Sequence, residues 1–305
     1  MSSASFRDWL VCTASSFLLF IIGMVSPVFS LPATFVFSFP SALLAVEYGA
    51  AAASSSVFMA SLLLSLVAPG FYSLMYFFMF GLSGMCIGLL AKFQLACGDF
   101  LMISSAMEFM GKLAGMLVLF LATGINTLSP DASEIEKIIV SLGLQPAERQ
   151  MLHTVMDRII ILIPYSMIIF SAAEATLCLI LLSYVHKKRT ATRIFTLPPF
   201  GDWKFPRSIL MALLIGFICV RITNGRENLY MVRQVGANLS ELSRTLFIVQ
   251  GLCCGYFFMA RRGIPKLLSV MMIAVMPFVP FLSDIFAIVG VADMGFNLRE
   301  RFRGA

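Results

Sequence analysis

The chain has 305 residues, of which 59% are hydrophobic and 12% are charged. Soluble domains contain about 45–50% apolar and about 25% charged residues, so this composition excludes an ordinary soluble fold. The formal net charge of +6 is typical of basic loops beside anionic lipids, and no nucleic-acid partner is expected. Because no polar stretch is long enough to fold alone, residues 1–305 are predicted to form a single integral membrane domain.

Apolar segments that approach or exceed the length needed to cross a bilayer, about 20 residues, recur along the whole chain. They predict an all-α fold, a polytopic transmembrane helical bundle with about 8 spans. In chain order, the predicted spans are residues 10–29, 32–46, 49–68, 71–91, 100–123, 159–184, 209–222 and 242–260.

A further apolar stretch covers residues 267–291 and contains two prolines and Asp284. It is long enough for a ninth span, but the prolines could instead fold it into a re-entrant hairpin. Three arginines follow near the C-terminus. They favour the hairpin, because a single crossing would place them on the outer side of the membrane.

The charges of the connecting loops predict how the bundle is oriented. The segment at about 185–208 holds six basic residues and one acidic residue, which predicts a cytoplasmic loop. Counting back from this loop places Arg7 and the N-terminus in the cytoplasm. The protein is expected to be a multi-pass protein of the inner (plasma) membrane. The loop at about 125–152 is richer in acidic residues and is predicted to lie outside. Within it, residues 133–144 predict a short amphipathic helix, either a connector or a lid.

Enzyme motifs are not supported by the sequence. Gly81-Leu82-Ser83-Gly84 has the G-x-S-G spacing of intramembrane serine proteases, but His153 and His186, the only two histidines, lie at or beyond the ends of predicted spans. The spacing of the seven cysteines supports neither a disulfide framework nor a zinc site. Nucleotide-binding motifs are also absent. The sequence therefore predicts that the protein is not an enzyme and binds neither a cofactor nor a metal.

Ionisable and amide side chains inside the spans are costly in a bilayer and mark candidate functional residues. Glu108 and Lys112 share one helix face, either as a local ion pair that permits insertion or as a polar lining for a substrate cavity. Glu174 has no basic residue one turn away, so it needs a proton or a partner from another helix, with Lys112, Arg221 and Arg244 as candidates. The predicted substrate-binding residues are Glu108, Lys112, Glu174, Gln250 and Asp284.

Small residues recur at spacings that let helices approach closely. Such faces predict either packing inside the bundle or docking of another membrane subunit. The positions are Ala42, Ala45, Gly49, Ala53, Gly84, Gly88, Gly111 and Gly115.

Three stretches of the chain resemble the YybS-like bacterial membrane proteins. They are the proline-bearing segment 37–44, the approach to a span at 198–206 with Trp203, and a C-terminal block with Gln250-Gly251, residues 262–266 and residues 290–293. That family is similar to the substrate-binding (S) components of energy-coupling factor vitamin transporters. The resemblance implies a helical bundle that captures a small molecule from outside.

In S components, small-residue faces dock onto a membrane coupling subunit that works with ATPases supplied in trans. By resemblance, Ala42, Ala45, Gly49 and Ala53 would supply that face here. The chain departs from the S components in having more predicted spans and no recognisable vitamin-binding signature.

Transport or capture of a small molecule is the leading predicted function, because transporters place polar groups near the bilayer midplane. The predicted partners are the lipid bilayer, a small-molecule ligand and a membrane coupling subunit. The alternative is a non-transporting membrane scaffold or assembly factor for cell-envelope machinery. Such a scaffold would use the small-residue faces and the basic loop as docking surfaces.

Overall fold

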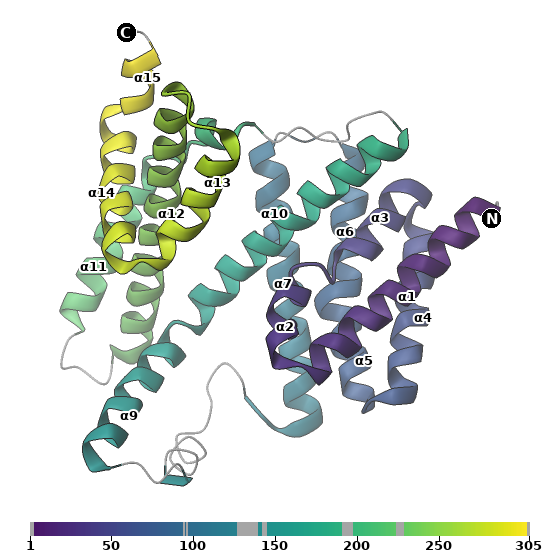
Figure 1. The fold of residues 1–305 in the computed structure, drawn as a ribbon. Helices are drawn as coiled ribbons and strands as arrows, with labels where there is room; N and C mark the ends of the chain where they lie inside the picture. The colour runs from purple at the N-terminus through teal and green to yellow at the C-terminus, as the bar shows by residue number, and fades with distance from the viewer. Residues whose placement is uncertain are drawn as a thin grey trace. The chain divides into compact units, whose positions relative to one another are not determined.

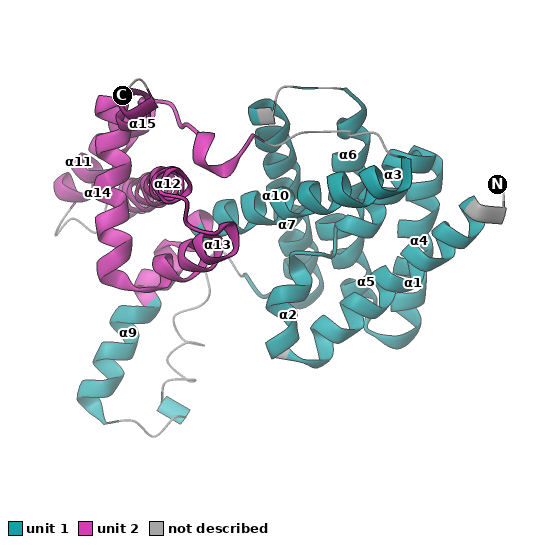
Figure 2. Cartoon of the chain, turned by 45° about the horizontal axis from the view of Figure 1, so that its top comes forward, with its two compact units in different colours: residues 1–156, 166–197 teal, residues 157–165, 198–305 magenta. Residues whose placement is uncertain are grey.

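The computed structural model describes residues 3–93, 95, 97–126, 140–141, 145–190, 198–223 and 229–303. Regular structure in these residues is entirely helical (Figure 1), which confirms the predicted all-α fold. The chain divides into two compact units (Figure 2), with residues 1–156 and 166–197 in unit 1 and residues 157–165 and 198–305 in unit 2. The sequence predicted a single integral membrane domain, and the division into two compact units does not test that prediction.

Unit 1 contains the N-terminal helices and most of α10. Its elements are α1 (Ser3–Val25), α2 (Pro27–Thr34), α3 (Phe39–Tyr48), α4 (Ala50–Val67), α5 (Gly70–Tyr76), the π-helix η1 (Phe77–Leu82), α6 (Ser83–Leu90), the 3-10 turn η2 (Ala91–Phe93), α7 (Cys97–Thr123), α9 (Pro146–Ile161) and α10 (Ile163–Thr190). The end of α9 and the first residues of α10 belong to unit 2.

Unit 2 contains the C-terminal helices. Its further elements are η3 (Phe200–Asp202), α11 (Ser208–Ile222), α12 (Tyr230–Arg261), α13 (Lys266–Val275), η5 (Met276–Phe278), α14 (Pro280–Phe296) and α15 (Leu298–Arg303). Helix α12 packs closely against α14 because two glycines have no Cβ. A Cβ on Gly251 would overlap the Phe286 carbonyl, and a Cβ on Gly290 would overlap the Phe247 carbonyl.

Seven helical segments in the described residues are long and apolar enough to cross a bilayer, or eight if the bent pair α13 and α14 counts as one span. This agrees with the predicted polytopic bundle. Helix α11 is the predicted seventh span, but its 15 residues extend only about 22 Å, less than the roughly 30 Å of hydrocarbon. Helix α12 begins at Tyr230, well before the predicted start at residue 242, because a helix can continue through charged residues that interrupt an apolar pattern.

Proline and glycine set the breaks in the N-terminal part. Helix α1 ends at Val25, because Pro27 takes the first position of α2, where its missing N–H needs no partner. The predicted first span, residues 10–29, is therefore too long at its end. The second predicted span is broken between α2 and α3. Gly49 alone separates α3 from α4, at a φ of +88° that a side chain would oppose.

The last apolar stretch bends where the sequence carries prolines. The segment Lys266–Phe278 and α14 meet at an angle of 106°. Pro277 lies in η5, and Pro280 occupies the first position of α14. A bend of this size occurs both in broken spans and in re-entrant loops.

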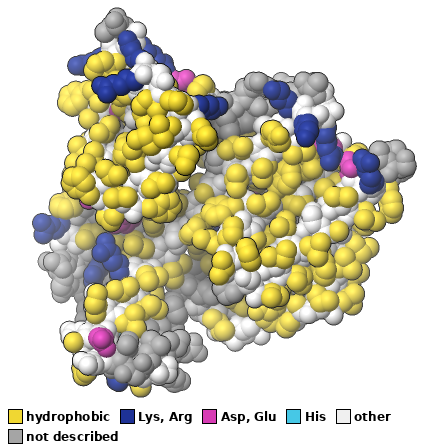
Figure 3. All heavy atoms as spheres, in the orientation of Figure 1, with side chains coloured by type: hydrophobic (Ala, Val, Ile, Leu, Met, Phe, Trp, Pro, Cys, Tyr) yellow, Lys and Arg dark blue, Asp and Glu magenta, His cyan; other side chains and the backbone are white. Residues whose placement is uncertain are grey.

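Hydrophobic side chains cover much of the surface in view in Figure 3. Val25, Leu66, Leu121 and Phe278 are 74–85% exposed. Large exposed apolar surfaces are rare on soluble monomers and are expected where helices face lipid. Composition, helix length and surface together show a multi-pass membrane protein in contact with the bilayer.

Two predictions concern the connecting segments. Of the predicted amphipathic helix at 133–144, only residues 140–141 lie within the described residues. The predicted basic loop at 185–208 begins as helix, since α10 continues to Thr190 and carries Lys187, Lys188 and Arg189 in its last turn. Basic residues at this end are favourable for the helix dipole.

Candidate functional site

Three ionisable side chains lie buried near the middle of spans in unit 1. Glu108 and Lys112 of α7 are 0% and 7% exposed, and Glu174 of α10 is 3% exposed. Two carboxyl groups and one ammonium group leave a formal charge of −1 when all are ionised. Ionisable groups at this depth are costly, which makes the cluster the strongest candidate site in unit 1.

Lys112 supplies the counter-charge for Glu174. Its ammonium forms an ion pair with the Glu174 carboxylate and donates a hydrogen bond to Ser171 Oγ at 3.2 Å. Of the three partners considered for Glu174, the structure selects Lys112. The described residues show no ion pair between Lys112 and Glu108, although the two lie one helical turn apart.

Glu108 is held by hydroxyl groups instead of a cation. The Ser83 hydroxyl lies 3.0 Å from Glu108 Oε2 and 3.5 Å from the Ser38 hydroxyl, and Ser38 also interacts with the Glu108 carboxyl. Glu108 Oε1 is buried and makes no hydrogen bond within the described part of the chain. Glu108 therefore keeps spare hydrogen-bonding capacity in the centre of the unit.

The π-helix η1 lies directly beside this cluster. A Cβ on Gly111 of α7 would lie 2.8 Å from the Phe78 carbonyl oxygen, and Gly115 similarly admits the Met79 side chain. The two glycines thus seat α7 against η1, one turn away from Ser83. Single-turn π segments frequently occur at functional sites. The sequence predicted a plain helix through this region.

The remaining small residues pack inside unit 1. Ala42, Ala45 and Ala53 are fully buried. A Cβ on Gly84 would overlap the Ser38 carbonyl, and one on Gly88 would overlap that of Ala42, so α3 and α6 are in backbone contact. Gly49, also proposed for docking, is only half-buried. This face already lies against helices of its own chain, while docking of another subunit stays a prediction.

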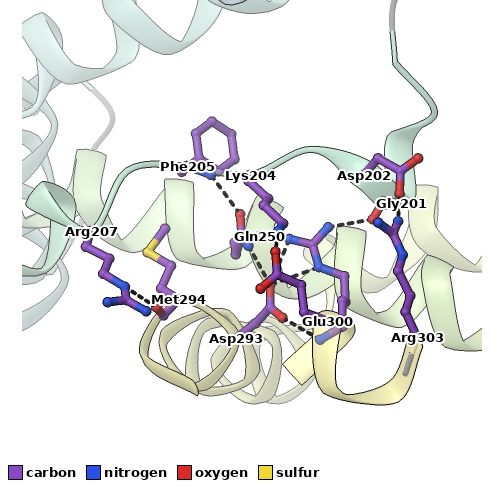
Figure 4. Close-up of polar contacts among 11 residues, drawn as sticks. Gly201, Asp202, Lys204, Phe205, Arg207, Gln250, Asp293, Met294, Glu300 and Arg303 are labelled. Carbon is purple, nitrogen blue, oxygen red and sulfur yellow. Dashed lines mark hydrogen bonds and ion pairs between the residues drawn. The ribbon is translucent and has the colours of Figure 1, made fainter. Parts of the chain in front are cut away.

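A second polar cluster lies in unit 2 (Figure 4). Gln250 of α12 donates from Nε2 to Asp293 Oδ2 at 2.5 Å and accepts from the Phe205 backbone N–H at 3.2 Å. The buried Arg299 guanidinium pairs with Asp293 at 2.7 Å and donates to the Gly201 carbonyl. Gln250 thus links α12 to the segment before α11 and to α14, whereas the sequence predicted it as a substrate-binding residue.

Two exposed ion pairs flank this cluster, Lys204 with Glu300 and Arg303 with Asp202. The hydrogen bond from Lys204 holds the pKa of the Glu300 carboxyl below its usual range. A cavity of about 230 Å³ is lined by Lys204, Phe205, Pro206, Arg207, Gln250, Asp293, Met294, Asn297, Arg299 and Glu300.

Asp284 belongs to unit 2 and does not line the cavity beside Gln250. Its side chain is 62% exposed and pairs with Arg244 at 2.6 Å. Of the five predicted substrate-binding residues, three come together in unit 1, namely Glu108, Lys112 and Glu174. Gln250 and Asp284 belong to unit 2, where they have different partners.

Several residues of these clusters were not predicted. Ser38, Ser83 and Ser171 lie beside the buried charges. Ser83 was noted only for its protease-like spacing, and serines are too common in apolar spans for the other two to stand out. Asp293 and Arg299 were not recognised as a pair, although both carried charge at the end of an apolar stretch. Asn238 was noted only as the start of a glycosylation sequon, Asn238-Leu239-Ser240. In the structure its Oδ1 accepts from Tyr165 N at 2.6 Å and its Nδ2 donates to Ile161 O at 2.7 Å, across the break between α9 and α10.

At one end of unit 1, Arg189 of α10 pairs with Asp8 of α1 at 2.7 Å and with Glu47 of α3 at 2.6 Å. The start of α1 therefore lies beside the end of α10. This agrees with the prediction that the N-terminus and the basic loop share one side of the membrane.

Comparison with known proteins gives a family match over most of the chain. The family described as "Predicted membrane protein (DUF2232)" matches residues 14–294. The protein "Uncharacterized protein YybS" of Bacillus subtilis (strain 168) is 30% identical over 127 residues, which cover 40% of each chain. The match thus spans about two fifths of this relative, and it confirms the predicted YybS-like resemblance. No solved structure matches. Because the family match covers nearly the whole sequence, the chain belongs to the DUF2232 family of predicted membrane proteins.

Proposed function

We propose that this protein captures or transports a small molecule, and that Glu108, Lys112 and Glu174 form its polar site. The observation that carries the proposal is the burial of all three groups near the midpoints of α7 and α10. Transporters place substrate and ion sites at this depth, where polar groups without a purpose would only destabilise the helices.

We place the protein in the plasma membrane with a cytoplasmic N-terminus, on the strength of the loop charges and the Arg189 contacts. We propose that it is not an enzyme. By resemblance to the S components, we further propose that it works with a membrane coupling subunit and with ATPases in trans.

The test is to purify the protein from its native membrane in mild detergent and to identify the retained small molecules and co-purifying proteins by mass spectrometry. We expect a retained metabolite in the wild type that is lost in Glu174→Gln. Glu148→Gln is the matched control, because Glu148 is exposed on α9 and lies outside the cluster. Unfolding midpoints of the three proteins would show whether loss of the metabolite reflects misfolding.

Two results would separate transport from the scaffold alternative. Recovery of a stoichiometric coupling subunit with ATPases, or of a metabolite that depends on Glu174, supports the proposal. Absence of any metabolite, together with stoichiometric recovery of cell-envelope proteins from wild type and Glu174→Gln alike, would overturn it and favour the scaffold.

A further inference from the structure

We propose that Glu108 is a proton-binding group, and that Lys112 is a shared counter-ion that moves from Glu174 to Glu108 when the proton leaves. This inference rests on the proposed function, because it makes the proton the coupling ion of the same site. It is carried by three observations on the surroundings of Glu108.

The first observation is the charge balance around Glu108. The titratable groups facing it are Lys112 on its own helix and Glu174 and Cys178 on α10. From α6 and the segment before α3, the hydroxyl groups of Ser83 and Ser38 approach it. Because Lys112 is paired with Glu174, an ionised Glu108 would be a buried charge without a direct partner, and protonation removes that cost.

The second observation concerns the single hydroxyl proton of Ser83. Its Oγ lies 2.8 Å from the Met79 carbonyl and 3.0 Å from Glu108 Oε2. One hydroxyl proton cannot serve both acceptors at once. If Glu108 is protonated, its own O–H donates to Ser83 Oγ, and Ser83 is free to donate to Met79. The protonated carboxyl therefore satisfies this geometry better than the carboxylate does.

The third observation is that Lys112 and Glu108 both have unused hydrogen-bonding groups with which they could pair. Within the described residues, Lys112 uses only two of its three N–H donors, and Glu108 Oε1 has no hydrogen bond. Glu108 precedes Lys112 by four residues, the spacing and order that favour an ion pair on a helix. An ionised Glu108 would thus find Lys112 within reach of a side-chain rotation.

The proposed step balances in atoms and charge. The O–H bond of Glu108 breaks, and its proton passes to water or to the bound ligand. Lys112 keeps its three protons and turns from Glu174 toward Glu108, so the site becomes more negative by one charge. Return of the proton would restore the first state, whereas binding of a cationic ligand between the two carboxylates would restore only its net charge.

The experiment is infrared difference spectroscopy of the protein in lipid vesicles, recorded while the pH is raised. We expect the wild type to lose a band of a protonated, buried carboxyl group, and we expect that band to be absent in Glu108→Gln. In Lys112→Met a second carboxyl band should appear, because neither carboxylate then has a counter-ion. Ser83→Ala should shift the wild-type band, since Ser83 contacts Glu108, whereas Ser171→Ala should leave it in place.

The serine pair keeps the test informative if Glu108→Gln does not fold. No carboxyl band in the wild type would overturn the inference, as would a band that responds to Ser171→Ala and not to Ser83→Ala. Loss of the band on addition of sodium at constant pH would also overturn it, in favour of a metal cation. A band assigned to Glu108, with no retained metabolite, would support proton binding and contradict the transport proposal. A metabolite that depends on Glu174, with no carboxyl band, would support the transport proposal and contradict proton binding at Glu108.

Discussion

Lys112 on α7 forms its ion pair with Glu174 on α10, 62 positions further along the chain. Two spans are thereby joined at their centres by a contact that is nearly sealed from the surroundings. A charge-assisted hydrogen bond of this kind is strong only while both partners are present.

Removing one partner of this pair should be costly. Lys112→Met leaves Glu174 buried without a cation, and we expect a loss of about 3–5 kcal/mol in the free energy of unfolding at neutral pH. The double variant Lys112→Met with Glu174→Gln should recover most of that loss, because neither charge remains. Unfolding of the single and double variants in detergent measures the coupling. Strictly additive losses would show that the two side chains do not interact.

Close contact between α3 and α6 should make Gly88 intolerant of substitution. A Cβ there would overlap the Ala42 carbonyl and lie 2.8 Å from the Ala45 Cβ. We expect Gly88→Ala to destabilise the protein by about 1–3 kcal/mol. The control is Gly98→Ala, since nothing lies within 4 Å of that position and alanine favours the helix by up to about 1 kcal/mol. Equal unfolding midpoints for both variants would contradict the observed packing.

Arg299 should matter more than its neighbour Arg301. Arg299 is buried against Asp293 and the Gly201 carbonyl, whereas Arg301 is exposed. Arg299→Met should therefore cost about 3–5 kcal/mol by leaving Asp293 buried and unpaired. Arg301→Met should stay within about 0.5 kcal/mol. Thermal unfolding in detergent compares them, and a larger effect at Arg301 would contradict this assignment.

The contact between Glu300 and Lys204 should make a small, pH-dependent contribution to stability. The folded-state pKa of Glu300 is lowered by the Lys204 hydrogen bond, so its contribution is present above the ordinary value of about 4.3 and is lost as the pH falls through the lowered value. Glu300→Gln should therefore lower the unfolding midpoint slightly at about pH 7 and not at about pH 3. Added salt should reduce the difference at neutral pH, because both side chains are exposed. A difference that grows in acid would contradict the sign.

Some features of the candidate site could be read from the sequence because they depend on a single helix. Glu108, Lys112 and Glu174 are conspicuous as charges within apolar segments, whatever the neighbouring helices are. Their pairing could not be read in this way. The local rule of four-residue spacing pointed from Glu108 to Lys112, but Lys112 reaches α10 because Glu174 is buried on the facing helix and has no counter-charge of its own.

The helix breaks also fall into two groups, those that local sequence predicts and one that depends on a neighbouring helix. Pro27, Pro277 and Pro280 interrupt or begin helices for a local steric reason, and the bends near the last two were predicted. The π-helix Phe77–Leu82 has no proline within it. This π-helix lies where Gly111 of α7 closely approaches the backbone. Because Gly111 belongs to another helix, no pattern within residues 77–82 could predict the π-helix.

The sequence by itself determined that this chain is a helical membrane protein and roughly where most of its spans lie. Partition into a bilayer depends on the summed hydrophobicity of about 20 consecutive residues, which is a local property. Only the tertiary structure decided which buried charges meet, that Asp284 stays exposed, and that Glu108 has hydroxyl groups rather than a cation beside it. Those outcomes depend on which helix faces come together, a property shared by segments far apart in the chain.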